Sequence, residues 1–176
     1  METLATISDV RRCRPSLEIA SDETDLLDSF LMEAQLLDVR PWLGDALLLE
    51  LVNQRRSGTL TPDNELLLEG GVYTYNGNSC YLVGLITCIC YYAMARSDNQ
   101  GTARFTQFGM VQKESDFSQP LTDKRISEIR ASNIDSAEAF KQDCIAMLRR
   151  RADKYPLFAC NSPRLKRRTN IRAIGK

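Results

Sequence analysis

The sequence predicts a mainly α-helical protein: a small helical bundle with a short β-hairpin, an extended arm and a basic C-terminal tail. Three observations support this fold class. Apolar residues recur at spacings of three and four over several segments. An Asn-Gly pair separates two short tyrosine-bearing runs. All acidic residues precede a final stretch rich in Lys and Arg. The chain of 176 residues suits one domain with appendages, which we place at 1–160, followed by a tail at 161–176.

Start and stop signals predict four helices in the first half of the chain, at residues 9–14, from about residue 21 to Pro41, at 46–56 and at 62–69. Ser8 is the expected N-cap of the first helix. Pro41 should end or kink the second, which carries a clear amphipathic stripe. The leucine-rich third segment should be buried on more than one side. Thr61, followed by proline, is a good start signal for the fourth.

Two longer helices are expected in the second half. The segment 82–96 is apolar nearly all round and should be the central core helix. Thr122 should cap a long helical region from Asp123 to about Lys154, closed by Pro156. Ser132–Ser136 is poor helix material, so a break could occur there. Unbroken, this element would be about 48 Å long, which exceeds what a single small core needs.

Two segments between these helices are candidates for contact with other molecules. The Asn-Gly turn predicts a hairpin over 72–82, whose tyrosines either pack on the core or bind a partner: Tyr73, Tyr75 and Tyr81. The segment 97–121 has no periodicity, yet it carries phenylalanines that suit a solvated coil poorly: Phe105, Phe108 and Phe117. We expect an extended arm with little helix that docks on another subunit, the alternative being a loop folded back on its own domain.

Limited proteolysis of the free monomer tests this expectation. If 97–121 is ordered mainly by contact with another subunit, a protease should cut there first. Protection equal to that of the core helix 82–96 in an isolated monomer would contradict the docking arm.

Charge is distributed unevenly. Of the 23 Lys and Arg residues, six lie in 161–176, which has no Asp or Glu. The preceding 160 residues therefore hold 17 basic against 23 acidic residues, a balance of −6 beside a tail of +6. The tail is either simply solvated or contacts DNA phosphates or an acidic protein surface. Ile171 and Ile174 favour docking. Its basic residues are Arg164, Lys166, Arg167, Arg168, Arg172 and Lys176.

Motifs for catalysis or cofactor binding are not recognisable. The sequence has no histidine, which removes the commonest general base and metal ligand, and no glycine-rich phosphate-binding motif. The six cysteines are expected to be mostly buried, reduced thiols, and Cys88-Ile89-Cys90 is a lone pair in apolar context, so we expect neither metal nor cofactor. No apolar run spans a membrane and no secretion signal begins the chain, which indicates a protein made in a cytoplasm.

Several motifs resemble phage proteins. Leu26, Leu27, Leu31 and Ala34, followed by Trp42-Leu43-Gly44, resemble the start of the head-to-tail connector (adaptor) proteins of tailed bacteriophages. Four later stretches resemble one family of phage structural proteins of unassigned function: Tyr73–Gly77, Tyr91–Arg96, Phe108–Lys113 and Lys154–Phe158. The resemblance covers most of 20–160. The basic tail is not matched.

This resemblance implies a non-enzymatic structural protein of the virion neck. It would form a homo-oligomeric ring of about twelve copies beneath the portal, between the portal and the tail or stopper proteins. The hairpin, the arm and the long helix would grip neighbours, and the tail could touch packaged DNA. Two alternatives remain: a DNA-binding packaging factor, which needs a groove-reading basic helix, and a cytoplasmic enzyme with motif-free chemistry.

Overall fold

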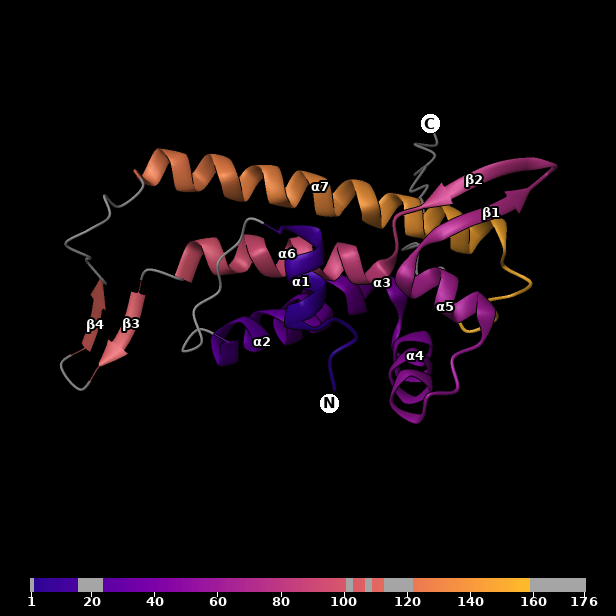
Figure 1. The fold of residues 1–176 in the computed structure, drawn as a ribbon, viewed down its shortest axis with the longest axis horizontal. Helices are drawn as coiled ribbons and strands as arrows, with labels where there is room; N and C mark the ends of the chain where they lie inside the picture. The colour runs from indigo at the N-terminus through magenta and orange to yellow at the C-terminus, as the bar shows by residue number, and fades with distance from the viewer. Residues whose placement is uncertain (1, 16–23, 101–102, 107–108, 113–121, 159–176) are drawn as a thin grey trace, which may run out of the picture.

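A computed structural model describes residues 2–15, 24–100, 103–106, 109–112 and 122–158, and confirms the mainly helical bundle with a short β-hairpin (Figure 1). The helices are α1 (Ile7–Cys13), α2 (Thr24–Glu33), the π-helix η2 (Ala34–Val39), α3 (Arg40–Leu43), α4 (Asp45–Ser57), α5 (Pro62–Glu69), α6 (Leu85–Gln100) and α7 (Asp123–Arg150). Strands β1 (Gly71–Tyr75) and β2 (Asn78–Leu82) pair antiparallel, as do β3 (Ala103–Thr106) and β4 (Gly109–Gln112).

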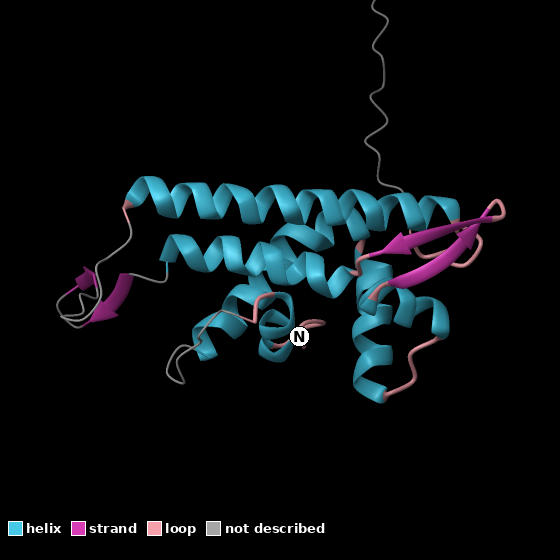
Figure 2. Cartoon of the chain, turned by 45° about the horizontal axis from the view of Figure 1, so that its top comes forward, coloured by secondary structure: helices cyan, strands magenta, loops and turns pink. Residues whose placement is uncertain are grey.

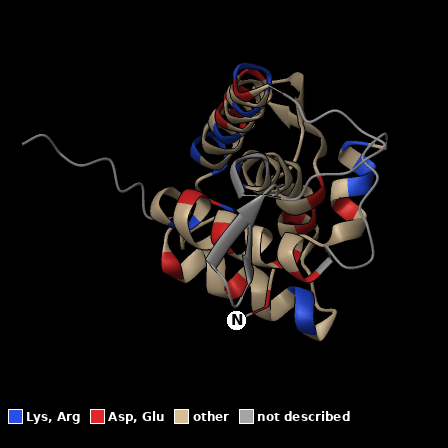
Figure 3. Cartoon of the chain, turned by 90° about the vertical axis from the view of Figure 1, so that its left-hand side faces the viewer, with Lys and Arg blue, Asp and Glu red and all other residues tan. Residues whose placement is uncertain are grey.

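Helix α6 is the central element of the core, as its apolar sequence predicts. It packs against α7 on one side and against α1, α2 and α5 on the other. In the view along the bundle, α6 lies between these elements, and α7 carries many more charged residues (Figure 3). The helix begins three residues later than expected because Leu82 still pairs with Gly71 in the hairpin. Its fully buried side chains are Leu85, Ile86, Cys88, Ile89, Cys90 and Ala93.

The first helix is capped by Thr6 and not, as expected, by Ser8. The backbone N–H of Thr6 donates to the Asp9 carboxylate at 2.8 Å, and the Thr6 hydroxyl accepts from the Asp9 N–H. This reciprocal cap needs an acid three residues after the cap, which Ser8 does not have. The preceding segment is held by buried Gln35, whose side-chain oxygen accepts from the Leu4 N–H at 2.6 Å.

Pro41 does not end the second helix, which continues through η2 and α3 to Leu43. Proline lacks an N–H, and its ring would clash with a carbonyl one turn earlier in a regular α-helix. Widening to a π-helix just before Pro41 accommodates both effects, and the Arg40 N–H bonds five residues back to Gln35. The helix ends at Gly44, whose φ of 88° few other residues tolerate.

Helices α4 and α5 lie close to their expected bounds. The buried residues of α4 form one face, Leu47, Leu48, Leu51 and Val52, so the expected burial on more than one side is wrong. Leu49 remains 50% exposed. Helix α5 starts as predicted, with the Thr61 hydroxyl accepting from the Asn64 N–H at 3.3 Å.

Helix α7 runs without a break through Ser132–Ser136. Its 28 residues make it about 42 Å long. Ser136 donates its hydroxyl hydrogen to the Ser132 carbonyl oxygen at 2.9 Å, within the helix. The helix stops at Arg150, four residues before the predicted end. No helix of the described ranges, α7 included, is long and apolar enough to cross a membrane.

In the segment 97–121, expected to be an extended arm with little helix, the described residues form the end of α6 and a hairpin that the sequence did not predict. Helix α6 continues to Gln100, and β3 and β4 form a second antiparallel hairpin in which Phe105 pairs with Met110. Two four-residue strands are too short to show clear alternation, and no Asn-Gly pair marks their turn. The β3–β4 hairpin lies past one end of the α6–α7 pair, and the β1–β2 hairpin lies at the other end (Figure 2). Phe108 and Phe117 lie outside the described residues.

Candidate functional site

The β1–β2 hairpin is the part of the candidate contact surface that the structure describes in full. Its turn residues, Asn76 with φ 50° and Gly77 with φ 79°, both adopt the left-handed conformation that a tight two-residue hairpin requires. The register places Val72 opposite Tyr81 and Tyr73 opposite Cys80. Because side chains alternate along a strand, these two pairs lie on opposite faces of the hairpin.

The base of the hairpin is fixed by a close crossing of two backbones. The chain leaving α5 at Gly70 and the chain entering α6 at Gly84 touch there. A Cβ at Gly70 would lie 2.5 Å from the Leu82 carbonyl oxygen, and one at Gly84 would lie 2.7 Å from Gly70 N. Both glycines also have positive φ. The orientation of the hairpin is therefore set by the backbone where it meets the central helix.

One face of the hairpin packs on the end of α7. Tyr73 is 7% exposed, and its hydroxyl oxygen accepts a hydrogen bond from Arg150 Nη1 at 3.0 Å. The same guanidinium lies 5.4 Å from the ring centroid of Tyr75, in a cation–π arrangement. Two of the three predicted contact tyrosines thus attach the hairpin to its own domain. Arg150, which the sequence marks only as part of the basic run Arg149–Arg151, is the anchor.

The other face is exposed and uncharged. Val72 is 68% exposed and Tyr81 is 71% exposed, although both are large apolar residues in directly opposite positions. No residue from Gly71 to Leu82 is charged. We call Val72 and Tyr81 the outer hairpin face. Tyr81 was predicted as a contact residue. Val72 was missed, and its position one residue before Tyr73 in an alternating strand was the signal that could have found it.

The remaining predicted contact residues are described only in part. Phe105 lies in β3, and its backbone is paired with that of Met110. The other two phenylalanines of the arm and the tail residues Arg164, Lys166, Arg167, Arg168, Arg172 and Lys176 lie outside the described residues.

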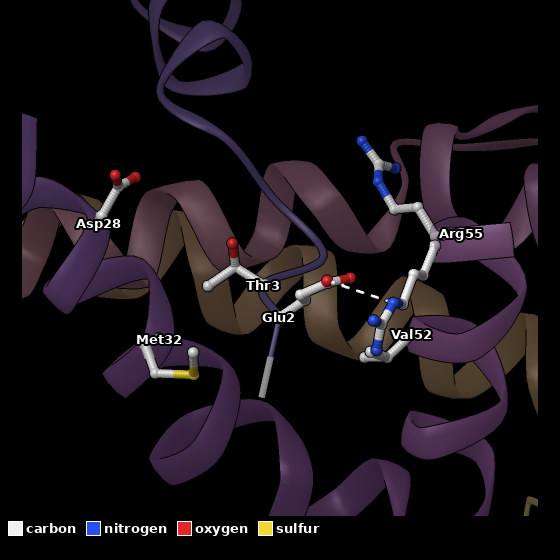
Figure 4. A pocket seen from close by; sticks show the side chains of 7 residues that line it. Glu2, Thr3, Asp28, Met32, Val52 and Arg55 are labelled. Atoms are coloured by element: carbon white, nitrogen blue, oxygen red, sulfur yellow. Dashed lines mark ion pairs between the residues drawn. The ribbon is translucent and has the colours of Figure 1, made fainter. Parts of the chain in front are cut away.

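A shallow groove between the N-terminal segment, α2 and α4 is a separate candidate site (Figure 4). Its volume is about 490 Å³, and Met32 and Val52 supply its apolar wall. Both arginines that line it already have acidic partners. Arg55 lies 3.2 Å from Glu69, and Arg56 lies 3.5 Å from Glu2 across the groove. Because both guanidinium groups are already paired with carboxylates, they are less available to bind an anionic ligand. The groove therefore does not indicate which class of ligand it could bind.

A partly buried polar contact joins α6 to α7. The Tyr92 hydroxyl donates to the Glu138 carboxylate, which also accepts from Lys141 Nζ at 3.0 Å. Burial disfavours the charged carboxylate, but these two hydrogen bonds outweigh it and lower the pKa of Glu138. Burial, together with the hydrogen bond, raises the pKa of Tyr92. The ionised, hydrogen-bonded carboxylate of Glu138 and the neutral phenol of Tyr92 therefore connect α7 to α6, which is a structural role. Among the described residues, no group of three His, Cys, Asp or Glu could hold a metal ion.

The fold and the site define a class: a helical bundle around α6 that presents a hairpin with one anchored and one exposed apolar face. The chain belongs to a family of unknown function (DUF6712), which matches residues 39–168. The match includes the β1–β2 hairpin, α6 and α7. No curated protein and no solved structure matches the chain significantly.

Proposed function

We propose that this protein is a structural subunit of the head-to-tail connector (adaptor) ring of a tailed phage, located in the virion neck beneath the portal. The observation that carries the proposal is the outer hairpin face, where two large apolar side chains are exposed on a hairpin whose base is fixed by the backbone crossing at Gly70 and Gly84. Exposed apolar surface of this kind is typical of interaction sites. The resemblance of the sequence to connector proteins supplies the identity of the assembly.

The arrangement of the projections supports a ring. The two hairpins lie at opposite ends of the α6–α7 pair, so a subunit can contact its two neighbours with different surfaces (Figure 1). Head-to-tail contacts of this kind close into a ring when the rotation between copies allows it. Many weak contacts around a closed ring then add up to a stable assembly.

The alternative of a DNA-binding packaging factor would use the basic helix face of Arg149–Arg151. Arg150 and Arg151 both make contacts within the domain. Arg150 donates to Tyr73, and Arg151 Nη2 lies 2.6 Å from the Asp63 carboxylate. An arginine that already holds a carboxylate or a tyrosine is less available to DNA phosphates. This observation favours the connector proposal over the packaging factor.

Negative-stain electron microscopy of the purified protein, alone and mixed with a portal, tests the proposal. Rings with a regular number of subunits, stacked on the portal, are the expected result. A protein that stays monomeric at high concentration and leaves the portal undecorated would contradict it. Retention on random-sequence duplex DNA without any ring would support the packaging factor instead.

The basic tail gives a further prediction. We expect deletion of 161–176 to leave the melting temperature nearly unchanged while reducing incorporation into particles, because six positive charges and two isoleucines would no longer meet an acidic surface of the neck. Exposed charge contacts are screened over about 8–10 Å at physiological salt, so binding through the tail should weaken as salt rises.

Affinity for duplex DNA separates the two partners of the tail. If the tail meets phosphates, the deletion should reduce DNA affinity steeply, and the salt dependence should flatten. If it meets protein, DNA affinity should not change. A deletion variant that assembles into infectious particles at wild-type yield would show that the tail has neither role.

A further inference from the structure

The register of the β1–β2 hairpin determines which of its backbone groups point away from the sheet. Tyr75 and Asn78 flank the two-residue turn and lie directly opposite each other, so they exchange both of their backbone hydrogen bonds. Along an antiparallel ladder, such hydrogen-bonded pairs alternate with pairs whose N–H and C=O groups point outward, along the edges of the sheet. The outward-pointing residues are Val72 and Thr74 on β1, and Ser79 and Tyr81 on β2.

The outer edge of β1 is open. In the part of the chain that the structure describes, no third strand joins this sheet, and no other backbone group bonds Val72 or Thr74. Both residues are exposed, whereas β2 is the strand that packs on α7. Edge strands are usually protected against pairing by charged residues or proline, and β1 carries neither. The β1 edge therefore offers donors and acceptors at the spacing that an added strand requires.

The β3–β4 hairpin is a second sheet with two described strands. Thr106 lies opposite Gly109 across two residues, so the same alternation applies to this hairpin. Strand β3 carries Arg104, whereas β4 is uncharged, as β1 is. Because charge on an edge strand discourages pairing, the edge of β4 suits an added strand better than that of β3. The outward-pointing residues of this hairpin are Ala103 and Phe105 on β3, and Met110 and Gln112 on β4.

We propose that these two open edges pair with each other between copies of this chain, so that β4 of one copy adds to the outer edge of β1 of the next. Strand addition of this kind takes its affinity from main-chain hydrogen bonds. Within one copy the two hairpins lie at opposite ends of the α6–α7 pair, so its own β1 and β4 lie far apart (Figure 1). An added strand would also cover one side of Val72, a large apolar side chain that is 68% exposed on this edge.

Each such contact uses β1 of one copy and β4 of the other. The contact is therefore head-to-tail, and it can repeat around a closed ring. The inference rests on the proposed function in taking a second copy as the partner, and it names the surface through which the copies recognise each other.

Proline substitutions test the pairing, because each removes a single backbone N–H. Thr74→Pro removes an N–H that the ladder within the hairpin does not use, so the hairpin should stay folded while its β1 edge is blocked. Ser79→Pro makes the same change on the edge of β2 and is the matched control. Gln112→Pro blocks β4, with Ala103→Pro on β3 as its control. In size-exclusion chromatography at a concentration where the wild type forms rings, we expect Thr74→Pro and Gln112→Pro to elute as monomers and both controls as rings.

A mixture of the two blocked variants gives a more specific result. Thr74→Pro retains an open β4, and Gln112→Pro retains an open β1, so one contact can form between them and no further copy can be added. Analytical ultracentrifugation of an equimolar mixture at high protein concentration should therefore show dimers. A mixture that stays monomeric, although each variant melts cooperatively, would overturn the pairing of β1 with β4. Rings formed by either variant alone would overturn it too.

Hydrogen exchange in the wild-type chain decides the question even if a proline weakens folding. The N–H groups of Val72 and Thr74 should exchange freely in the monomer and become protected in the assembled ring, whereas the Ser79 N–H should change little. If rings form while Val72 and Thr74 stay unprotected, the pairing is wrong and the proposed connector ring stands. If the wild type forms no ring, alone or on the portal, the pairing and the proposed function are both wrong.

Discussion

Ile89→Asp should unfold the whole domain. Ile89 is fully buried on α6, the helix that contacts α1, α2, α5 and α7, and aspartate there would place an unpaired charge in the centre of the core. An uncompensated buried charge costs about 3–5 kcal/mol, and the lost packing adds to this cost. Domains of this size are stabilised by only about 5–15 kcal/mol in total. Circular dichroism and thermal melting of the purified variant should show no cooperative transition.

The matched control is Leu49→Asp on α4. It makes the same kind of change in a helix, but Leu49 is 50% exposed and its charge stays in water. The expected loss is under about 1 kcal/mol, mainly from helix propensity. A soluble Ile89→Asp protein that melts like the wild type would show that α6 is not the core of the fold.

The central helix could be predicted because its composition and its apolar pattern both indicate a buried helix. From Leu85 to Ala95 no residue is charged and Thr87 is the one hydroxyl-bearing aliphatic residue, so nearly every face of this helix would expose apolar surface to solvent. The start of α7 was equally clear, since Thr122 caps it and the helix continues in the expected register. Local capping and periodicity alone determine such elements.

Other elements are decided by competition between interactions, and the outcome of that competition cannot be read from the sequence alone. Pro41 is a strong stop signal, but burial of Ala34, Gln35 and Val39 against the core favours a π-helical turn over a break. Ser8 and Thr6 are both acceptable caps in isolation, and only the Asp9 carboxylate decides between them. The β3–β4 hairpin has no Asn-Gly turn, so its pairing is visible only in three dimensions.

The candidate site, too, could be predicted only in part from the sequence. The sequence indicated a hairpin with tyrosines, but not which of its faces meets the domain. That choice depends on Arg150, some 70 residues further along the chain, whose guanidinium holds Tyr73 and lies over Tyr75. Once these two rings face inward, the alternation of the strand leaves Tyr81 and Val72 outside.

The outer hairpin face gives the prediction with the largest effect on assembly. The double variant Val72→Thr, Tyr81→Lys should remain folded and fail to form rings. Threonine keeps a β-branched side chain, and a single lysine avoids placing like charges opposite each other in the strand pair. Both side chains are more than two-thirds exposed, so thermal stability should change by less than about 1 kcal/mol. Loss of one buried aromatic anchor costs an interface about 2 kcal/mol, or roughly 30-fold in affinity, and every contact in the ring would lose it.

The measurement is size-exclusion chromatography and negative-stain microscopy at equal protein concentration, with and without the portal. Leu49→Lys is the matched control, because it replaces an exposed apolar residue by the same charge on a different element, α4. We expect it to assemble normally. If it also prevents assembly, added charge at any exposed apolar position is sufficient and the outer hairpin face is not special. Rings of the Val72→Thr, Tyr81→Lys variant on the portal at wild-type yield would contradict the interface directly. The exposed valine and tyrosine would then have to be ascribed to the ordinary apolar content of a protein surface, since isolated exposed apolar residues are common and need no partner.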